Sequence, residues 1–126
     1  MRLIVQKVSK SSVKIDGEVV GKINKGYMVL VGITDGDDEI LVGKMVDKLV
    51  NLRIFEDEND KLNLSLLDVQ GSILSISQFT LYANCKKGRR PSFIDAAKPD
   101  VSKPLYDLFN KKLEEKGVKV ERGVFG

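Results

Sequence analysis

The sequence has 126 residues, of which 42% are hydrophobic and 31% charged, and its formal net charge is +3. These values are typical of one soluble globular domain, and no apolar run approaches the roughly 20 residues that span a bilayer. There is no histidine and one cysteine, Cys85, which excludes Ser-His-Asp and Cys-His catalysis, an internal disulfide and the usual zinc sites. We therefore expect a cytoplasmic protein without a metal or cofactor.

The first half of the chain predicts strands and one helix. Alternating apolar residues indicate a strand over 1–8 and a hairpin over 12–23, with an Asp-Gly turn between its two strands. Residues 26–33 are almost wholly apolar, as in a strand with both faces covered. A helix with one broad apolar face is expected over about 38–52, and aspartates at its start can cap it.

The second half predicts shorter strands and a second helix. Strands are expected over 52–55, 62–66, 72–79 and 118–121. A long connection over 84–103 is rich in Lys, Gly and Pro, and loops of this length are often functional. Ser102 can cap a helix that has Pro104 in its first turn and ends at Gly117. This order predicts an α/β domain over 1–126, in which two sheets pack together and both helices cover one outer face.

The polar chemistry is concentrated in residues 72–93. The strand predicted there ends in Ser77-Gln78-Phe79-Thr80, whose hydroxyl and amide groups can orient a polar substrate. A basic loop follows, and its backbone N–H groups near the glycine and its charged side chains suit phosphate oxygens. The loop consists of Lys86, Lys87, Gly88, Arg89, Arg90, Pro91, Ser92 and Phe93. The simpler alternative is that the polar residues merely finish a strand and that the charged run is a solvated turn.

The segments SQFTLYA and KKGRRPSF, in this order, resemble the SQ-x-T strand and the G-x-RPSF loop of the D-aminoacyl-tRNA deacylase family. The resemblance extends to MRLIVQKV, LVGI, KLVNLRIFED and GVFG, and so covers almost the whole chain. It implies an enzyme that uses water to cut the ester between a D-amino acid, or glycine, and the 3′-terminal adenosine of tRNA, as translation quality control. It also implies a homodimer of three-layer α/β/β architecture: two packed, mostly antiparallel, barrel-like sheets with both helices on one outer face.

By the same resemblance, Ser77, Gln78, Phe79 and Thr80 line the catalytic pocket, and Gln6 lies near the adenosine. We expect backbone N–H groups near Phe79 and Thr80 to form an oxyanion hole, and Phe79 to stack on the adenine. Thr80 as a covalent nucleophile is the alternative, but no histidine or other evident base is available to take its proton. Activation of water by a ribose hydroxyl of the tRNA fits this sequence better.

The basic loop completes the implied site. Its four cationic residues are the candidates for phosphate binding, and Pro91, Ser92 and Phe93 match the part that forms a wall of the pocket. In the family, the chain continues beyond the GVFG position to a Gly-Pro segment with a cis bond. In the dimer this segment reaches into the partner's site and rejects L-amino acids. We expect the corresponding segment to follow Gly126 in the complete protein.

Two other functions remain open at this stage. A non-catalytic module that binds the tRNA end or a nucleotide would use the same basic loop, and would bind tRNA with a steep salt dependence and without turnover. A dimeric scaffold would have no RNA role at all. Structural roles also compete at single positions, since Phe79 could belong to the core, Thr80 could simply suit a strand, and Gln6 could be an ordinary surface residue.

Overall fold

The computed structural model describes residues 1–9, 11–15, 17–82 and 96–123, with only the backbone described at 11–15, 20, 80 and 82. The elements are β1 (Arg2–Val8), β2 (Ser11–Ile15), β3 (Glu18–Ile23), β4 (Gly26–Gly32), α1 (Glu39–Asn51), β5 (Phe55–Glu56), β6 (Leu62–Leu64), β7 (Ser72–Ser77), the 3₁₀ turn η1 (Phe79–Tyr82), α2 (Pro99–Glu115) and β8 (Lys119–Arg122). No helix in these stretches is long and apolar enough to cross a membrane.

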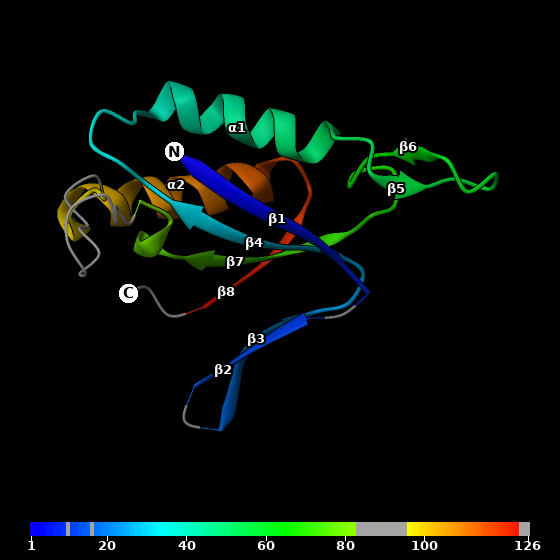
Figure 1. The fold of residues 1–126 in the computed structure, drawn as a ribbon, viewed down its shortest axis with the longest axis horizontal. Helices are drawn as coiled ribbons and strands as arrows, with labels where there is room; N and C mark the ends of the chain where they lie inside the picture. Colours follow the sequence, from blue (N-terminus) through cyan, green and yellow to red (C-terminus); the bar gives the residue numbers. More distant parts are fainter. Residues whose placement is uncertain (10, 16, 83–95, 124–126) are drawn as a thin grey trace, which may run out of the picture.

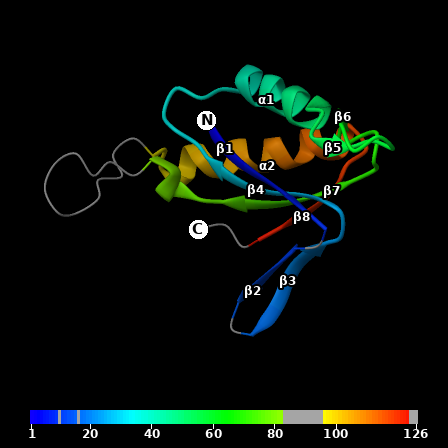
Figure 2. The same ribbon diagram turned by 45° about the vertical axis from the view of Figure 1, so that its right-hand side comes forward.

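A four-stranded sheet in the order β1-β4-β7-β8 forms the centre of the fold. Figure 1 shows both helices on one side of this sheet and the β2–β3 hairpin on the other, and the turned view in Figure 2 agrees. The hairpin lies against β7 and β8, where a Cβ atom on Gly21 would be 3.3 Å from Leu74 Cδ1. The predicted α/β class, with both helices on one outer face, is confirmed.

One detail of the predicted architecture is wrong. The sheet is open rather than barrel-like, because β1 and β8 are its two edges and do not pair with each other in the described part of the chain. Across all the described sheets the pairing is mostly antiparallel, as predicted, because β1–β4, β2–β3 and β5–β6 are antiparallel. Within the central sheet, however, β4–β7 and β7–β8 are parallel. The cause is the topology: α1 lies between β4 and β7 in the chain, α2 lies between β7 and β8, and a helical crossover brings the next strand back in the same direction.

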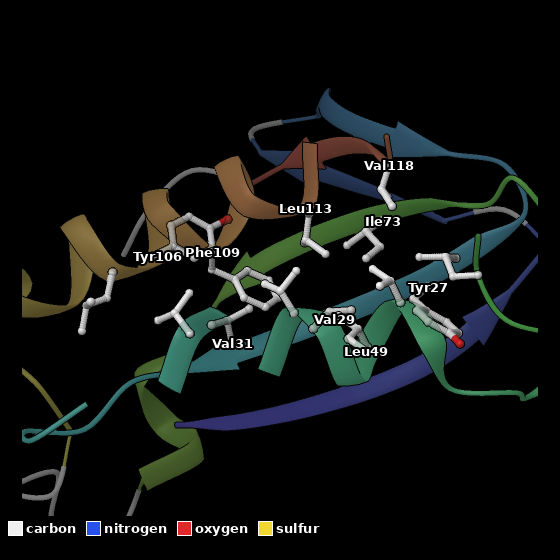
Figure 3. Close-up of a cluster of buried hydrophobic side chains, with 14 of the residues drawn as sticks. Tyr27, Val29, Val31, Leu49, Ile73, Tyr106, Phe109, Leu113 and Val118 are labelled. Atoms are coloured by element: carbon white, nitrogen blue, oxygen red, sulfur yellow. The ribbon is translucent and has the colours of Figure 1, made fainter. Parts of the chain in front are cut away.

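The hydrophobic core lies between the sheet and the two helices, as Figure 3 shows. Alternate residues of β4, namely Tyr27, Val29 and Val31, share the face that is covered by the helices. They belong to one buried cluster with Leu49 of α1 and Phe109 of α2. Full burial of a large apolar side chain stabilises the fold by about 1.5–3 kcal/mol. This packing holds β4 firmly, and β4 in turn supports the end of β7 that carries the candidate site residues.

The first helix begins and ends within one residue of its prediction. Asp38 is the N-cap of α1, and its Oδ1 accepts a hydrogen bond from the backbone N–H of Leu41 at 2.8 Å. The residues buried on α1 are Val42, Val46, Leu49 and Val50. Their i, i+4 spacing forms the apolar stripe expected of a helix packed on a sheet.

The second helix starts earlier than predicted. α2 begins at Pro99, so Ser102 lies inside its first turn instead of capping it, and Pro104 lies in the helix interior. A proline at the first helical position gives up only an N–H that would have no partner within the helix, which makes Pro99 the better start. The predicted end is confirmed, because Gly117 follows the last residues of α2 with a φ of +87° and its N–H donates to Glu114 O at 2.9 Å.

The strand predicted over 52–55 is wrong except at its last residue, since β5 covers only Phe55–Glu56, and the strand predicted over 62–66 is shortened to β6, Leu62–Leu64. These two strands form a separate antiparallel pair with a shifted register. The carboxylate of Asp57, which follows β5, accepts the backbone N–H groups of Asn59 at 2.8 Å and Lys61 at 3.1 Å. These hydrogen bonds lower the pKa of Asp57 below its usual value, and the bond from Lys61 has the largest effect. The turn that Asp57 stabilises therefore limits the length of β5 and β6, the strands on either side of it.

Replacement of Gly26 by alanine is expected to lower the free energy of unfolding by about 3 kcal/mol or more. Gly26 begins β4 with a φ of +156°, and a Cβ atom there would lie 1.8 Å from the carbonyl oxygen of Ser72, which cannot move without disturbing the sheet. Gly36→Ala is the matched control, because Gly36 has a φ of +93° but open space around it, so only the backbone strain of about 1 kcal/mol applies. Urea unfolding measures both, and equal losses would contradict the steric argument.

Candidate active site

The predicted site residues Ser77 to Thr80 lie at the carboxyl end of β7 and in the turn η1 that follows it. The pairing of β7 with β4 ends at Val31 and Ser77, and Gln78 adds one bond from its N–H to Val31 O at 2.9 Å. The chain then turns into η1, where Leu81 N–H donates to Gln78 O at 3.4 Å. The strand predicted over 72–79 is therefore too long, because β4 ends one residue further on and offers no backbone to pair with. The four predicted residues are divided between a strand end and a helical turn.

Strand alternation separates Ser77 from Gln78. Ser77 shares its face with Ile73, which belongs to the core beneath the helices. The backbone of Gln78 still bonds to β4, so the same alternation directs its side chain to the opposite face. Ser77 therefore lies at the edge of the core layer, whereas Gln78 belongs to the side of the sheet away from the helices.

That second side is only partly covered by the described residues. Ile4 of β1, Leu30 of β4 and Ile76 of β7 lie in register across it, and we call the surface they form the open face. Leu30 and Ile76 are half-buried, while the side chain of Ile4 is 51% exposed. The β2–β3 hairpin lies over β7 and β8, further along the sheet. The open face is thus an apolar surface next to Gln78.

Gln6 also lies on the open face and is exposed, but it is not beside Gln78. Its register partner is Met28, whereas Gln78 follows the pair Val31–Ser77. Four residues of strand, about 13 Å, separate the levels of the two glutamines. A substrate that contacts both must extend along the open face.

Phe79, the first residue of η1, is 48% exposed. This exposure excludes the alternative that Phe79 is an ordinary core residue, since core phenylalanines are almost fully buried. An exposed aromatic ring beside polar groups is the arrangement on which nucleic-acid bases stack.

Arg2 is a neighbour of the site that sequence reasoning misses. Its Nη1 donates to the backbone oxygen of Leu81, in η1, at 2.7 Å. The resembled segment MRLIVQKV contains Arg2, but nothing in the sequence pattern assigns it a role near the end of β7. Only the strand register, which sets Arg2 opposite Gly32, reveals that it reaches the turn.

Several predicted residues lie outside the described part of the structure. The backbone of Thr80 is in η1, but its side chain is outside the description. The whole basic loop, Lys86 to Phe93, and Cys85 also lie outside it. Their roles remain predictions from the sequence.

Among the described residues, the three groups whose pKa values are clearly shifted lie away from this end of the sheet. The carboxylates with lowered pKa values are those of Asp57 and Asp68, which both lie beside turns near β6. For Asp68, the main cause is a hydrogen bond from the backbone N–H of Ser65. Burial raises the pKa of Tyr27, at the start of β4, to about 12. Within the same residues, no group of three metal-binding side chains occurs. Perturbed pKa values often mark catalytic acids and bases, so the described part of the site offers positioning and hydrogen bonds instead.

Known proteins resemble this chain over its full length. The family model described as D-Tyr-tRNA(Tyr) deacylase matches residues 4–126. Proteins named D-aminoacyl-tRNA deacylase are 61% identical in Bacillus pumilus and 58% identical in Brevibacillus brevis, over 100% of this chain and 86% and 87% of theirs.

Two solved structures have the same fold. The one titled "c-Myc DNA Unwinding Element Binding Protein" has a TM-score of 0.92 and 36% identity, over 100% of this chain and 86% of that one. A probable eukaryotic D-amino acid tRNA deacylase has a TM-score of 0.83 and 21% identity, over 98% and 88%.

Proposed function

The chain belongs to the D-Tyr-tRNA(Tyr) deacylase family, and from this premise we propose that the end of β7, the turn η1 and the open face form its active site. The chain is a D-aminoacyl-tRNA deacylase, an enzyme that hydrolyses the ester between a D-amino acid and tRNA. The observation that carries this function is the alignment of the whole chain to a protein named D-aminoacyl-tRNA deacylase, with 61% identity. The position of Gln78 and η1 at an open, partly apolar surface supports the location of the site.

The turn η1 suits a role in stabilising negative charge. A 3₁₀ turn bonds its own backbone from its third residue onward, here from Leu81 N–H to Gln78 O. The turn itself does not use the N–H of Thr80, and we propose that this group donates to the ester oxygen as it becomes negative. Fixed donors aimed at developing charge usually contribute more to such catalysis than any other effect, and one donor contributes about 100- to 1,000-fold in rate.

The nucleophile in this proposal is water. Its oxygen attacks the ester carbonyl carbon, and the bond from that carbon to the ribose 3′ oxygen then breaks. The 3′ oxygen takes up a proton, which leaves free D-amino acid and tRNA. The neighbouring ribose hydroxyl orients the water and relays its proton, because the sequence has no histidine and the two described carboxylates with shifted pKa values, Asp57 and Asp68, have lowered values and lie beside turns near β6. Thr80 is then a pocket residue and not the nucleophile.

The substrate is held mainly at its RNA end and at the main-chain part of its amino acid. The adenine stacks on Phe79, Gln6 contacts the adenosine further along the open face, and the basic loop 86–90 binds phosphates. A pocket built from backbone donors and Gln78 does not depend on the side chain of the amino acid, so glycyl-tRNA and many D-aminoacyl-tRNAs are accepted. The reaction takes place in the cytoplasm, as quality control in translation.

A second copy of the chain completes the site in this proposal. Ile4 is an exposed apolar residue of the open face on the edge strand β1, in register with Leu30 and, beyond it, Ile76. Burial of such residues drives association, and a two-fold axis applies the same patch twice. The homodimer therefore forms through the open face and encloses the substrate there.

Side-by-side hydrolysis of a D-aminoacyl-tRNA and its L-counterpart tests the function. Turnover of the D form by wild type, and loss of about 100-fold in Gln78→Ala without a change in unfolding midpoint, is the expected result. Hydrolysis of both the D- and the L-aminoacyl-tRNA would show that the chain is a hydrolase without chiral selectivity. No turnover by a folded protein that still binds tRNA, with affinity falling steeply in salt, would overturn the enzyme and favour the binding module.

A further inference from the structure

Three hydrogen bonds among the described residues show how the turn η1 is held at its base, inside it and at its far side. At its base, Gln78 N–H donates to Val31 O at 2.9 Å, and inside it Leu81 N–H reaches Gln78 O at a long 3.4 Å. At its far side, Arg2 Nη1 donates to Leu81 O at 2.7 Å. The bond from Arg2 is the shortest of the three, and it has an ionised donor, which makes such bonds stronger than neutral ones.

Arg2 reaches η1 from β1, although β4 lies between β1 and β7. Its register partner on β4 is Gly32, which has no side chain. Two strand spacings, about 9.6 Å, separate β1 from β7, a span that a long side chain can bridge only where nothing stands in its way. The glycine at position 32 provides such a gap at the level of Gln78.

We propose that Arg2 is a positioning residue for the active site: through its bond to Leu81 O it fixes the orientation of η1, and with it Phe79 and the N–H of Thr80. The inference rests on the proposed function of this turn. Arg2 does not need to touch the reacting atoms. An oxyanion donor that is displaced by a fraction of an ångström contributes far less in the transition state, so loss of the bond lowers kcat more than it raises KM.

Lys7 supplies a matched control on the same strand. Its Nζ also donates to a backbone oxygen, that of Ile54, at 3.2 Å, and this bond is exposed like that of Arg2. Lys7 lies at the other end of β1, so Lys7→Gln removes the same kind of contact and the same charge at a distance from η1. Lys7 Nζ also lies 6.0 Å from the centroid of the Phe55 ring, and both variants remove a charged hydrogen bond to a backbone oxygen, one beside η1 and one far from it.

The test measures kcat, KM and backbone amide exchange for both variants. Arg2→Gln is expected to lower kcat by about 10- to 100-fold with KM changed less than about threefold, and Arg2→Lys to recover part of the loss. Hydrogen exchange in the segment 78–82 becomes several-fold faster in Arg2→Gln. Lys7→Gln changes neither readout, and the unfolding midpoints of the two glutamine variants agree.

Equal kcat in the two glutamine variants, or a loss in Arg2→Gln that appears only as a raised KM, would overturn the inference. Unchanged exchange in 78–82 would overturn it as well, even if activity fell, because Arg2 would then not hold the turn. If the wild type does not hydrolyse D-aminoacyl-tRNA, the proposed function fails, and the exchange experiment still decides whether Arg2 orders η1.

Discussion

A D-aminoacyl-tRNA that ends in 2′-deoxyadenosine is expected to be hydrolysed about 100- to 10,000-fold more slowly than the normal substrate, the range over which a positioned proton-transfer group contributes. The 126-residue sequence contains no histidine, and the carboxylates with shifted pKa values among the described residues lie beside turns near β6 with values lowered, not raised. A hydroxyl on the substrate is then the group best placed to handle the proton of the attacking water. Single-turnover rates with enzyme in excess measure the chemical step directly.

Two controls separate this outcome from its rivals. The spontaneous hydrolysis of each ester without enzyme corrects for the intrinsic effect of the missing hydroxyl, and direct binding measurements show whether the deoxy substrate still occupies the site. Mass spectrometry of rapidly quenched enzyme is expected to show no aminoacyl adduct. Equal rates for the two substrates, together with an adduct on Thr80, would establish Thr80 as a covalent nucleophile and refute the proposal.

The parts of the fold that depend on local chemistry could be predicted from the sequence. The start of α1 follows from Asp38 and its bond to Leu41 N–H, and the end of α2 follows from Gly117 at a positive φ. Cap residues act on neighbouring backbone groups, so their effect is visible in a short window. Parallel pairing of β4 with β7 is not visible in this way, because it depends on the path of the whole crossover.

The candidate site shows the same limit. The SQFTLYA segment identifies the residues Gln78 to Thr80, but their alternating pattern cannot reveal that the strand ends at Ser77, since this depends on where its neighbour β4 stops. The relation of Arg2 to Leu81 and the distance of Gln6 from Gln78 likewise follow from strand order and register. Position along the sequence indicates which residues matter, and long-range pairing decides which of them meet.

Replacement of Ile4 by aspartate is expected to convert the proposed dimer into a monomer and to reduce deacylase activity strongly, by about 100-fold as for the loss of one group that stabilises the transition state. Ile4 is 51% exposed on the edge-strand side of the open face, so a charge there is tolerated by the isolated chain. In a symmetric dimer the same change occurs twice, and each buried carboxylate without a partner costs several kcal/mol. A total of about 4 kcal/mol or more weakens association roughly 1,000-fold.

Ile40→Asp is the matched control, because Ile40 is also exposed, at 70%, but lies on α1 in the helical layer. Sedimentation velocity gives the oligomeric state of wild type and both variants, and hydrolysis of D-aminoacyl-tRNA is measured at the same concentrations. If the open face is the interface, only Ile4→Asp sediments as a monomer, and higher protein concentration restores its dimer and its activity together. A fully active monomer would show that one copy of the open face is sufficient for the reaction. An Ile4→Asp variant that remains dimeric would place the contact between subunits elsewhere, because a surface that accepts two uncompensated carboxylates is still in contact with water.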